Sequence, residues 1–318
     1  YLLETLKLLR DRQWLVPRLG ADGTWQLEAG VDMAALGEAR SRRELLPPSV
    51  RMLILARLAP LSQAARQLVQ GVAVLGILAS APQLWQLAEL GVQAGVEALE
   101  EAIKSGILRE EEAGGPGVGN LGSYRFSHDL VRDVVYTELG AARRQVLHQR
   151  ALAMLEREGA RTFELAYHAK SSGEVEAVYR YSVQAGLEAA AVFAVEEAIG
   201  YYEQARAWLQ EQKRLQTELS AWEVERLYTH LGRAYANQNA WEKAQQAYEE
   251  LLDYARQQRQ FTLVSLALNR LTILAIQQSH DKSRVRALLE EARQMAQTSS
   301  DQKALAETEW NLAQIAAN

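Results

Sequence analysis

The sequence predicts a mainly all-α protein. Among its 318 residues, Ala, Leu, Glu, Gln and Arg are abundant and only 6 are proline. The abundant residues lose little side-chain freedom in a helix, whereas proline interrupts one. After residue 160 the apolar residues recur at helical spacing and no strand pattern remains. Hydrophobic residues make up 48% of the chain, which is enough to bury the cores of about two or three domains.

Charge and composition exclude several classes of protein. The formal net charge is −5 and there is no cysteine. A mildly acidic chain lacks the positive surface of a dedicated nucleic-acid binder. Without cysteine there are no disulfides, thiol nucleophiles or thiolate zinc sites, which is compatible with the cytoplasmic location that we expect. The longest apolar stretch, Val72 to Ala81, is about half the length needed to span a bilayer, so we expect no membrane partner.

The first 44 residues are expected to form a connecting segment. Leucines in residues 1–13 share one helical face. Asp22-Gly23 then separates two short apolar stretches, which predicts a β-hairpin. Because Tyr1 starts within a helical pattern and residues 310–318 look like an unfinished amphipathic helix, we expect the chain to be a piece of a longer protein that is truncated at its C-terminal end.

Residues 45–158 are predicted to form a winged-helix domain, in which helices precede a small β-hairpin. The hairpin strands are Ile107–Glu110 and Tyr124–Ser127, on either side of a glycine-rich loop. The six helices are predicted at Ser49–Leu58, Ser62–Leu75, Gln83–Leu90, Val96–Lys104, Asp129–Glu138 and Arg143–Glu158.

An internal repeat predicts an α-solenoid over residues 159–318. Two sets of residues have the same spacing, namely Gly186, Ala198, Tyr202 and Ala205, and Gly232, Ala244, Tyr248 and Leu251. Weaker copies begin at Thr272 and Ala313. Small residues let paired helices approach closely, and the aromatic residue fills the gap to the next pair. The pattern matches the tetratricopeptide repeat, stretched beyond its usual length of about 34 residues.

Several short stretches carry a resemblance to a known family. They are Leu46–Val50, Ala56–Leu58, Val74–Gly76, Phe126–Asp133, Arg143-Arg144 and Leu147-His148. With the order of the domains, they resemble the STAND signal-transduction ATPases, which include bacterial AAA-type regulators and the NB-ARC proteins. In that family a P-loop ATPase precedes a helical lid, a winged helix and a repeat sensor. The resemblance implies that residues 1–44 are the end of the lid with a connecting segment, 45–158 the winged helix and 159–318 the sensor.

The resemblance implies a regulatory role without catalysis in this chain. No Gly-x-x-x-x-Gly-Lys-Ser/Thr motif is present and no strand ends in paired acidic residues, so hydrolysis has no phosphate cradle and no magnesium ligand. ADP, ATP and magnesium are therefore expected only in the parent ATPase. Its core would be one partner, and a protein or small-molecule inducer on the repeats would be another. ATP exchange would then permit oligomerisation of the full-length signalling or transcriptional regulator. The alternative is a standalone protein-binding scaffold without nucleotide switching.

His128 and Asp129 are the candidate nucleotide-binding residues. They lie where a strand meets a helix, and the resemblance implies that His128 contacts the β-phosphate of ADP while Asp129 caps the helix. The alternative is that both residues only cap that helix. Ser127-His128-Asp129 is not a catalytic triad, because neighbouring residues on a strand point to opposite faces.

Two further motifs are better explained without nucleic acid or nucleotide. Residues 117–122 match Gly-x-Gly-x-x-Gly, but they follow an acidic stretch and lead into a strand, so they are interpreted as a loop. Helix Val96–Lys104 would enter the DNA groove, yet it carries three glutamates and one lysine. Direct DNA binding is therefore not expected.

The repeat register predicts a ligand-binding face on the inner side of the solenoid. Its residues are Arg180, Arg226, Thr229, Arg233, Asn237 and Asn269. Three arginines on one face could bind an acidic peptide or an anionic ligand. Ordinary solvated helix faces are the alternative. The five histidines show no metal-ligand spacing, and His168 and His230 are interpreted as core residues.

Overall fold

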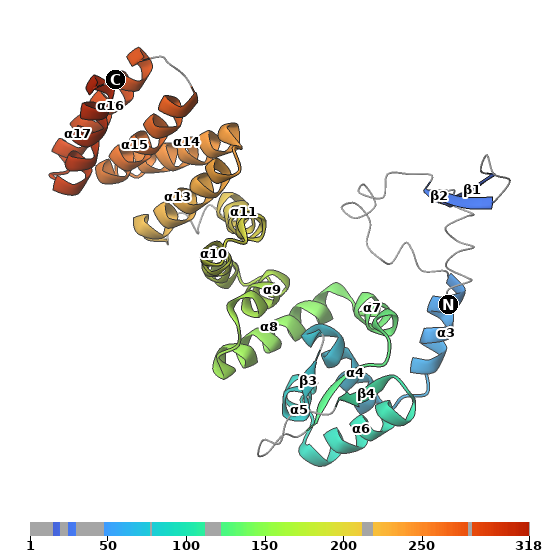
Figure 1. Ribbon diagram of the computed structural model, residues 1–318. Helices are drawn as coiled ribbons and strands as arrows, with labels where there is room; N and C mark the ends of the chain where they lie inside the picture. Colours follow the sequence, from blue (N-terminus) through green and yellow to red (C-terminus); the bar gives the residue numbers. More distant parts are fainter. Residues whose placement is uncertain are drawn as a thin grey trace. The chain divides into compact units, whose positions relative to one another are not determined.

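The computed structural model describes residues 15–19, 25–29, 48–76, 78–111, 122–211, 219–278 and 282–317. In this part of the chain the protein is mainly helical, with one two-stranded and one three-stranded sheet (Figure 1). The chain divides into two compact units, Tyr1–Glu158 and Gly159–Asn318, which are described separately. No helix among the described residues is long and apolar enough to cross a membrane. The predicted helix of residues 1–13 lies outside the described residues.

The predicted N-terminal hairpin is confirmed. Strand β1, Leu15–Leu19, pairs antiparallel with β2, Trp25–Ala29, and Leu19 lies opposite Trp25. Asp22-Gly23 lies between the two strands in the sequence, outside the described residues.

Helix α4, Gln63–Leu75, is the centre of unit 1 because several of its faces are buried. It packs against α5, α6, α7 and α8 (Figure 1). Its apolar residues recur at helical spacing, and Leu68, Val69 and Val72 are almost fully buried. Ser62 caps its N-terminus, since the Ser62 hydroxyl accepts a hydrogen bond from the Ala65 amide at 3.2 Å.

The other helices of unit 1 lie close to the predicted ranges. Helix α5 begins at Ala81 and α6 at Val92, each earlier than predicted. Pro82 lies in the first turn of α5, where its missing N–H group costs no helical hydrogen bond. The bounds are α3 Pro48–Leu58, α5 Ala81–Ala88, α6 Val92–Lys104, α7 Asp129–Glu138 and α8 Ala141–Glu158.

A third strand joins the predicted hairpin. Strands β4, Leu108–Glu111, and β5, Ser123–Phe126, pair antiparallel as expected. The two-residue strand β3, Ala79–Ser80, pairs with the other edge of β5, so the order is β3-β5-β4. Two residues of low strand propensity carry no periodic pattern, which is why β3 was not predicted.

His148 is a fully buried histidine of α8. Its Nε2 lies 2.9 Å from the Tyr136 hydroxyl of α7, and the two rings meet edge to face. Burial, with a smaller effect of Arg144, lowers the pKa of His148 from 6.5 to about 4. The folded protein therefore keeps this ring neutral at pH values where the unfolded chain takes up a proton.

Unit 1 should consequently lose stability as the pH falls below 6.5. The unfolded chain binds a proton at His148 between pH 6.5 and about 4, and the folded chain does not. We expect a loss of about 2 kcal/mol between pH 7 and pH 5, measured by urea unfolding. His148→Gln keeps a polar partner for Tyr136 and should flatten this dependence. The same slope in both proteins would contradict the assignment.

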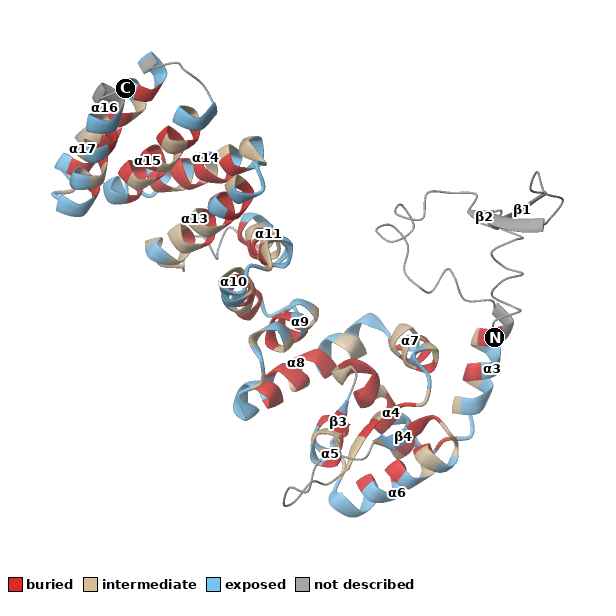
Figure 2. Cartoon of the chain, in the orientation of Figure 1, coloured by how far each residue is buried: buried red, intermediate tan, exposed pale blue. Residues whose placement is uncertain are grey.

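Unit 2 consists of helices that pack in consecutive pairs. Contacts join α10 to α11, α13 to α14 and α15 to α16 (Figure 1). Figure 2 shows buried residues recurring along the facing sides of these helices. The bounds are α9 Thr162–Ser172, α10 Val175–Ala191, α11 Val195–Glu211, α13 Ala221–Asn237, α14 Trp241–Gln257, α15 Phe261–Gln278, α16 Lys282–Thr298 and α17 Gln302–Ala317.

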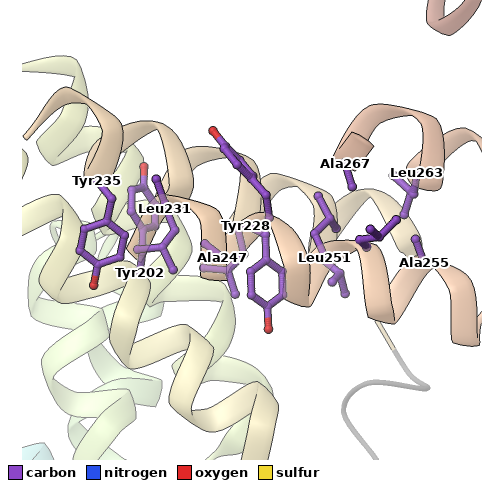
Figure 3. Close-up of a cluster of buried hydrophobic side chains, with 14 of the residues drawn as sticks. Tyr202, Tyr228, Leu231, Tyr235, Ala247, Leu251, Ala255, Leu263 and Ala267 are labelled. Atoms are coloured by element: carbon purple, nitrogen blue, oxygen red, sulfur yellow. The ribbon is translucent and has the colours of Figure 1, made fainter. Parts of the chain in front are cut away.

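The repeated glycines and tyrosines lie in direct contact. A Cβ atom on Gly186 would stand 2.4 Å from the Tyr202 ring, and one on Gly232 would stand 2.4 Å from the Tyr248 ring. Tyr202 lies among Leu231, Tyr235 and the other buried side chains of the core (Figure 3). Only glycine leaves room for the ring between the paired helices.

Gly232→Ala should therefore destabilise unit 2 although alanine favours helix formation. We expect a loss of about 2 kcal/mol, because the added methyl group forces the Tyr248 ring to move. Gly200→Ala on α11 is the matched control, since nothing lies within 4 Å of its added Cβ. It should be neutral or stabilising by about 1 kcal/mol in urea unfolding. Equal effects of the two substitutions would refute the packing argument.

Candidate functional site

A cavity of about 310 Å³ lies between α13 and α15. Thr229, Arg233 and Asn237, three of the predicted ligand-binding residues, line it from α13. Arg270 and Gln277 line it from α15. The structure thus brings three of the six predicted ligand-binding residues together around one cavity.

The cavity combines positive charge with an apolar wall. Tyr248, Ile273 and Leu274 supply apolar surface. Arg233 is exposed and donates a hydrogen bond to Nδ1 of His230 at 3.2 Å, whereas Arg270 forms an ion pair with Glu307 at 3.0 Å. This arrangement suits a ligand with one anionic group and an apolar body.

Arg180 and Arg226 do not line this cavity. Arg180 lies over the ring of Tyr181, with its guanidinium carbon 4.6 Å from the ring centre. Arg226 donates to the Gln184 side chain at 3.2 Å, and its guanidinium carbon lies 5.9 Å from the centre of the Trp222 ring. Both arginines therefore make cation–π contacts, in which the face of an aromatic ring attracts the guanidinium charge.

The assignment of Asn269 to the inner face is wrong. Asn269 is fully buried between α15 and α17. Its side-chain amide donates to the Ser265 carbonyl at 3.0 Å and to the Thr308 hydroxyl at 2.8 Å, and its oxygen accepts from Asn311 at 2.9 Å. A buried amide needs such partners, so Asn269 holds two helices together and is closed to a ligand.

The next residue, Arg270, lines the cavity and was not among the predicted ligand-binding residues. The register came from the repeat at Gly232 and was carried into a weaker copy, so an error of one position was enough to exchange a buried residue for a half-buried one that lines the cavity. On a helix, one position corresponds to a rotation of about 100°. The charge of Arg270 was the available indication, because an unpaired arginine is seldom fully buried.

His128 and Asp129 lie at the junction of β5 and α7, and both are exposed. The prediction that Asp129 caps the helix is wrong, because His128 occupies the cap position and Asp129 is the first helical residue. The His128 side chain makes no capping hydrogen bond, which also removes the alternative of simple capping. The Asp129 carboxylate still lies in the first turn, where the helix dipole favours negative charge.

The junction is held in place by backbone contacts with the turn before β4. The Ser127 amide donates to the Ile107 carbonyl at 2.9 Å. Arg57, from the end of α3, donates to the carbonyls of Ser105 and Gly106 at 3.1 and 3.3 Å. The backbone before His128 is therefore fixed, while its imidazole faces solvent.

Neither a metal-ligand cluster nor a similar known protein points to a function. In the part of the chain that the structure describes, no group of three or more His, Asp or Glu side chains is placed to hold a metal ion. Comparison with known protein families, with curated proteins and with solved structures finds no match for the chain. The cavity of unit 2 and the β5–α7 junction of unit 1 are therefore the two candidate functional regions.

The burial of Asn269 predicts a structural role that can be measured. Asn269→Ala should cost about 2–3 kcal/mol of unfolding free energy, because Thr308 and Asn311 both lose a buried partner. Asn237→Ala, at an exposed position, is the control and should change stability by about 0.5 kcal/mol or less. A neutral Asn269→Ala would show that the contact with α17 is not formed.

Proposed function

We propose that this chain is the regulatory and sensor portion of a STAND-type ATP-dependent signalling or transcriptional regulator. The observation that carries the proposal is the position of His128 at the junction of β5 and α7. Its side chain is exposed and makes no capping hydrogen bond, and the preceding backbone is held by a hydrogen bond. A histidine whose backbone is held in place and whose side chain does not cap its own helix is available to bind a group from outside unit 1.

The order of elements in unit 1 supports a winged-helix domain. Helix α4, strand β3, helices α5 and α6, and the β4–β5 hairpin follow one another, with β3 completing the sheet. Glu97 and Glu100 are exposed on α6, the helix that would enter a DNA groove. Their charge opposes contact with phosphates, so unit 1 serves in this proposal to report nucleotide state instead of binding DNA.

The paired helices of unit 2 support a tetratricopeptide-like sensor. The contacts of Gly186 with Tyr202 and of Gly232 with Tyr248 repeat from one pair to the next. The cavity between α13 and α15 gives this sensor a place for an activating ligand or protein.

His128 would act as the contact that holds the inactive state. Its imidazole would donate a hydrogen bond to the β-phosphate of ADP held by the ATPase core of such a regulator. A ligand bound to unit 2 would favour an open state in which this bond is absent. Exchange of ADP for ATP in the core would then permit oligomerisation.

A standalone scaffold remains the second candidate function. It is favoured by the position of the cavity, which is formed wholly by residues of unit 2 and needs no nucleotide. The two candidates differ in one simple observation, namely whether the gene encodes a P-loop upstream of Tyr1.

The switch proposal predicts that His128→Ala in the full-length protein releases ADP faster and raises basal activity. Loss of one charge-assisted hydrogen bond should weaken ADP binding by roughly tenfold. ADP retention after gel filtration and basal ATP turnover are the measurements. Glu97→Ala, an exposed change on α6, should leave both unchanged. Normal ADP retention in His128→Ala would rule out this role.

A further inference from the structure

One stripe of α13 carries positive charge that unit 2 does not neutralise. Arg226, His230 and Arg233 lie on successive turns of this helix. Among the described residues, neither arginine has a carboxylate partner. Arg226 donates to the Gln184 oxygen and Arg233 to Nδ1 of His230, each at 3.2 Å. Both acceptors are neutral, so two guanidinium charges remain available on one face.

Tyr202 adds an unsatisfied hydroxyl group to the same place. Its side chain is fully buried, and its hydroxyl has no hydrogen-bond partner within the described part of the chain. The centre of its ring lies 6.2 Å from that of His230. In Figure 3 the Tyr202 hydroxyl points away from the side to which those of Tyr228 and Tyr235 point. Tyr235 donates to Glu203 at 2.9 Å, whereas the charges that act on Tyr202 are those of Arg233 and Arg226.

The field of the two arginines reaches the Tyr202 hydroxyl. Burial raises the pKa of Tyr202 to about 12, and Arg233 and Arg226 act in the opposite direction. An unpaired buried donor facing two cations is costly unless an acceptor enters. An oxyanion is an acceptor for both guanidinium groups, and it reaches the Tyr202 hydroxyl once the side chains that cover this group move aside.

The next repeat contains a related arrangement. Tyr248 packs on Gly232 as Tyr202 packs on Gly186. The fields of Arg270 and Arg233 both lower the pKa of Tyr248, which burial raises more strongly. Arg233 therefore acts on two phenol groups supplied by the same position of successive repeats.

We propose that Arg226, His230, Arg233 and Tyr202 form an oxyanion site for the carboxylate or phosphate group of a ligand, and that His230 takes up a proton when the anion binds. The site lies beside the cavity between α13 and α15 and shares Arg233 with it. Its regulatory meaning rests on the sensor role proposed above.

Proton uptake follows from the groups that surround His230. Burial lowers its pKa, and Arg233 and Arg226 lower it further. The neutral Tyr202 of α11 contacts its ring, and the charges that act on it are those of Arg233 and Arg226. Around these arginines, Gln184 of α10 accepts a hydrogen bond from Arg226, and Arg270 of α15 acts with Arg233 on Tyr248 of α14.

Because Nδ1 of His230 accepts a hydrogen bond from Arg233, the neutral ring carries its hydrogen on Nε2 and the added proton goes to Nδ1. Arg233 must therefore exchange its bond to His230 for one to the anion. An anion between the arginines offsets their field and raises the pKa of His230. Binding is therefore tighter at low pH, and it tightens as the pH falls toward the pKa that His230 has in the complex.

A titration of the whole chain with sulfate tests the site. Sulfate keeps the same charge from pH 5.5 to 8, so any pH dependence of binding belongs to the protein. We expect saturable binding, detected through the NMR signals of His230, that is roughly three- to tenfold tighter at pH 6 than at pH 8. Acetate and methyl phosphate at pH 7.5 then distinguish a carboxylate from a phosphate ligand by their relative affinities.

Matched variants locate the site. Arg233→Gln should weaken sulfate binding roughly tenfold or more, and Arg286→Gln, an equal charge change at an exposed position of α16, should not. Tyr202→Phe keeps the ring and should weaken binding by a smaller factor. His230→Gln should bind sulfate without pH dependence. Circular dichroism confirms that each variant is folded.

The sulfate titration and the His128→Ala test can fail independently of each other. Absence of saturable binding, or equal binding by Arg233→Gln and Arg286→Gln, would overturn the oxyanion site. Binding that does not change with pH in the unsubstituted chain would overturn proton uptake. If sulfate binds as expected but His128→Ala retains ADP normally, the switch fails and the oxyanion site stands.

Discussion

The contact between a tyrosine ring and a glycine of the paired helix is the constraint on which unit 2 depends. Because Gly186 and Gly232 carry no Cβ atom, the rings of Tyr202 and Tyr248 can lie against the backbone of the first helix of each pair. The same contact decides where the phenol groups end. The Tyr202 hydroxyl lies within the field of Arg226 and Arg233, so a packing requirement also builds the polar surface on which ligand binding is proposed.

Charge is distributed unequally within unit 2. Arg206 of α11 donates to Glu250 at 2.9 Å and to Glu203 at 2.9 Å, and these bonds hold its pKa above the ordinary value. Its charge is therefore neutralised by carboxylates within the fold, and the bond to Glu250 joins α11 to α14. On α13, Arg226 and Arg233 have neutral acceptors, and no carboxylate pairs with either of them in the part of the chain that the structure describes. The difference between compensated and uncompensated arginines is what distinguishes a structural network from a candidate binding face.

Histidines of one chain serve different purposes because their surroundings differ. His148 is fully buried, contacts Tyr136 and stays neutral, so it belongs to the core of unit 1. His128 is exposed at a junction whose backbone is fixed by the Ser127 amide and the Ile107 carbonyl. His230 is partly buried between two arginines. Burial and neighbouring charge, more than the residue type, assign each its role.

The sequence by itself determined the helices, both hairpins and the contact partners Gly232 and Tyr248, because each depends on spacing along a short stretch of chain. It also placed Thr229, Arg233 and Asn237 on a common face. Only the tertiary structure decided which faces are covered. Asn269 is buried by Thr308 and Asn311, which lie 39 and 42 residues farther along the chain, and Tyr202 reaches His230 from another helix. Helical periodicity reports which residues share a face, but the neighbour that covers that face comes from distant sequence, and so does the field that acts on its charged groups.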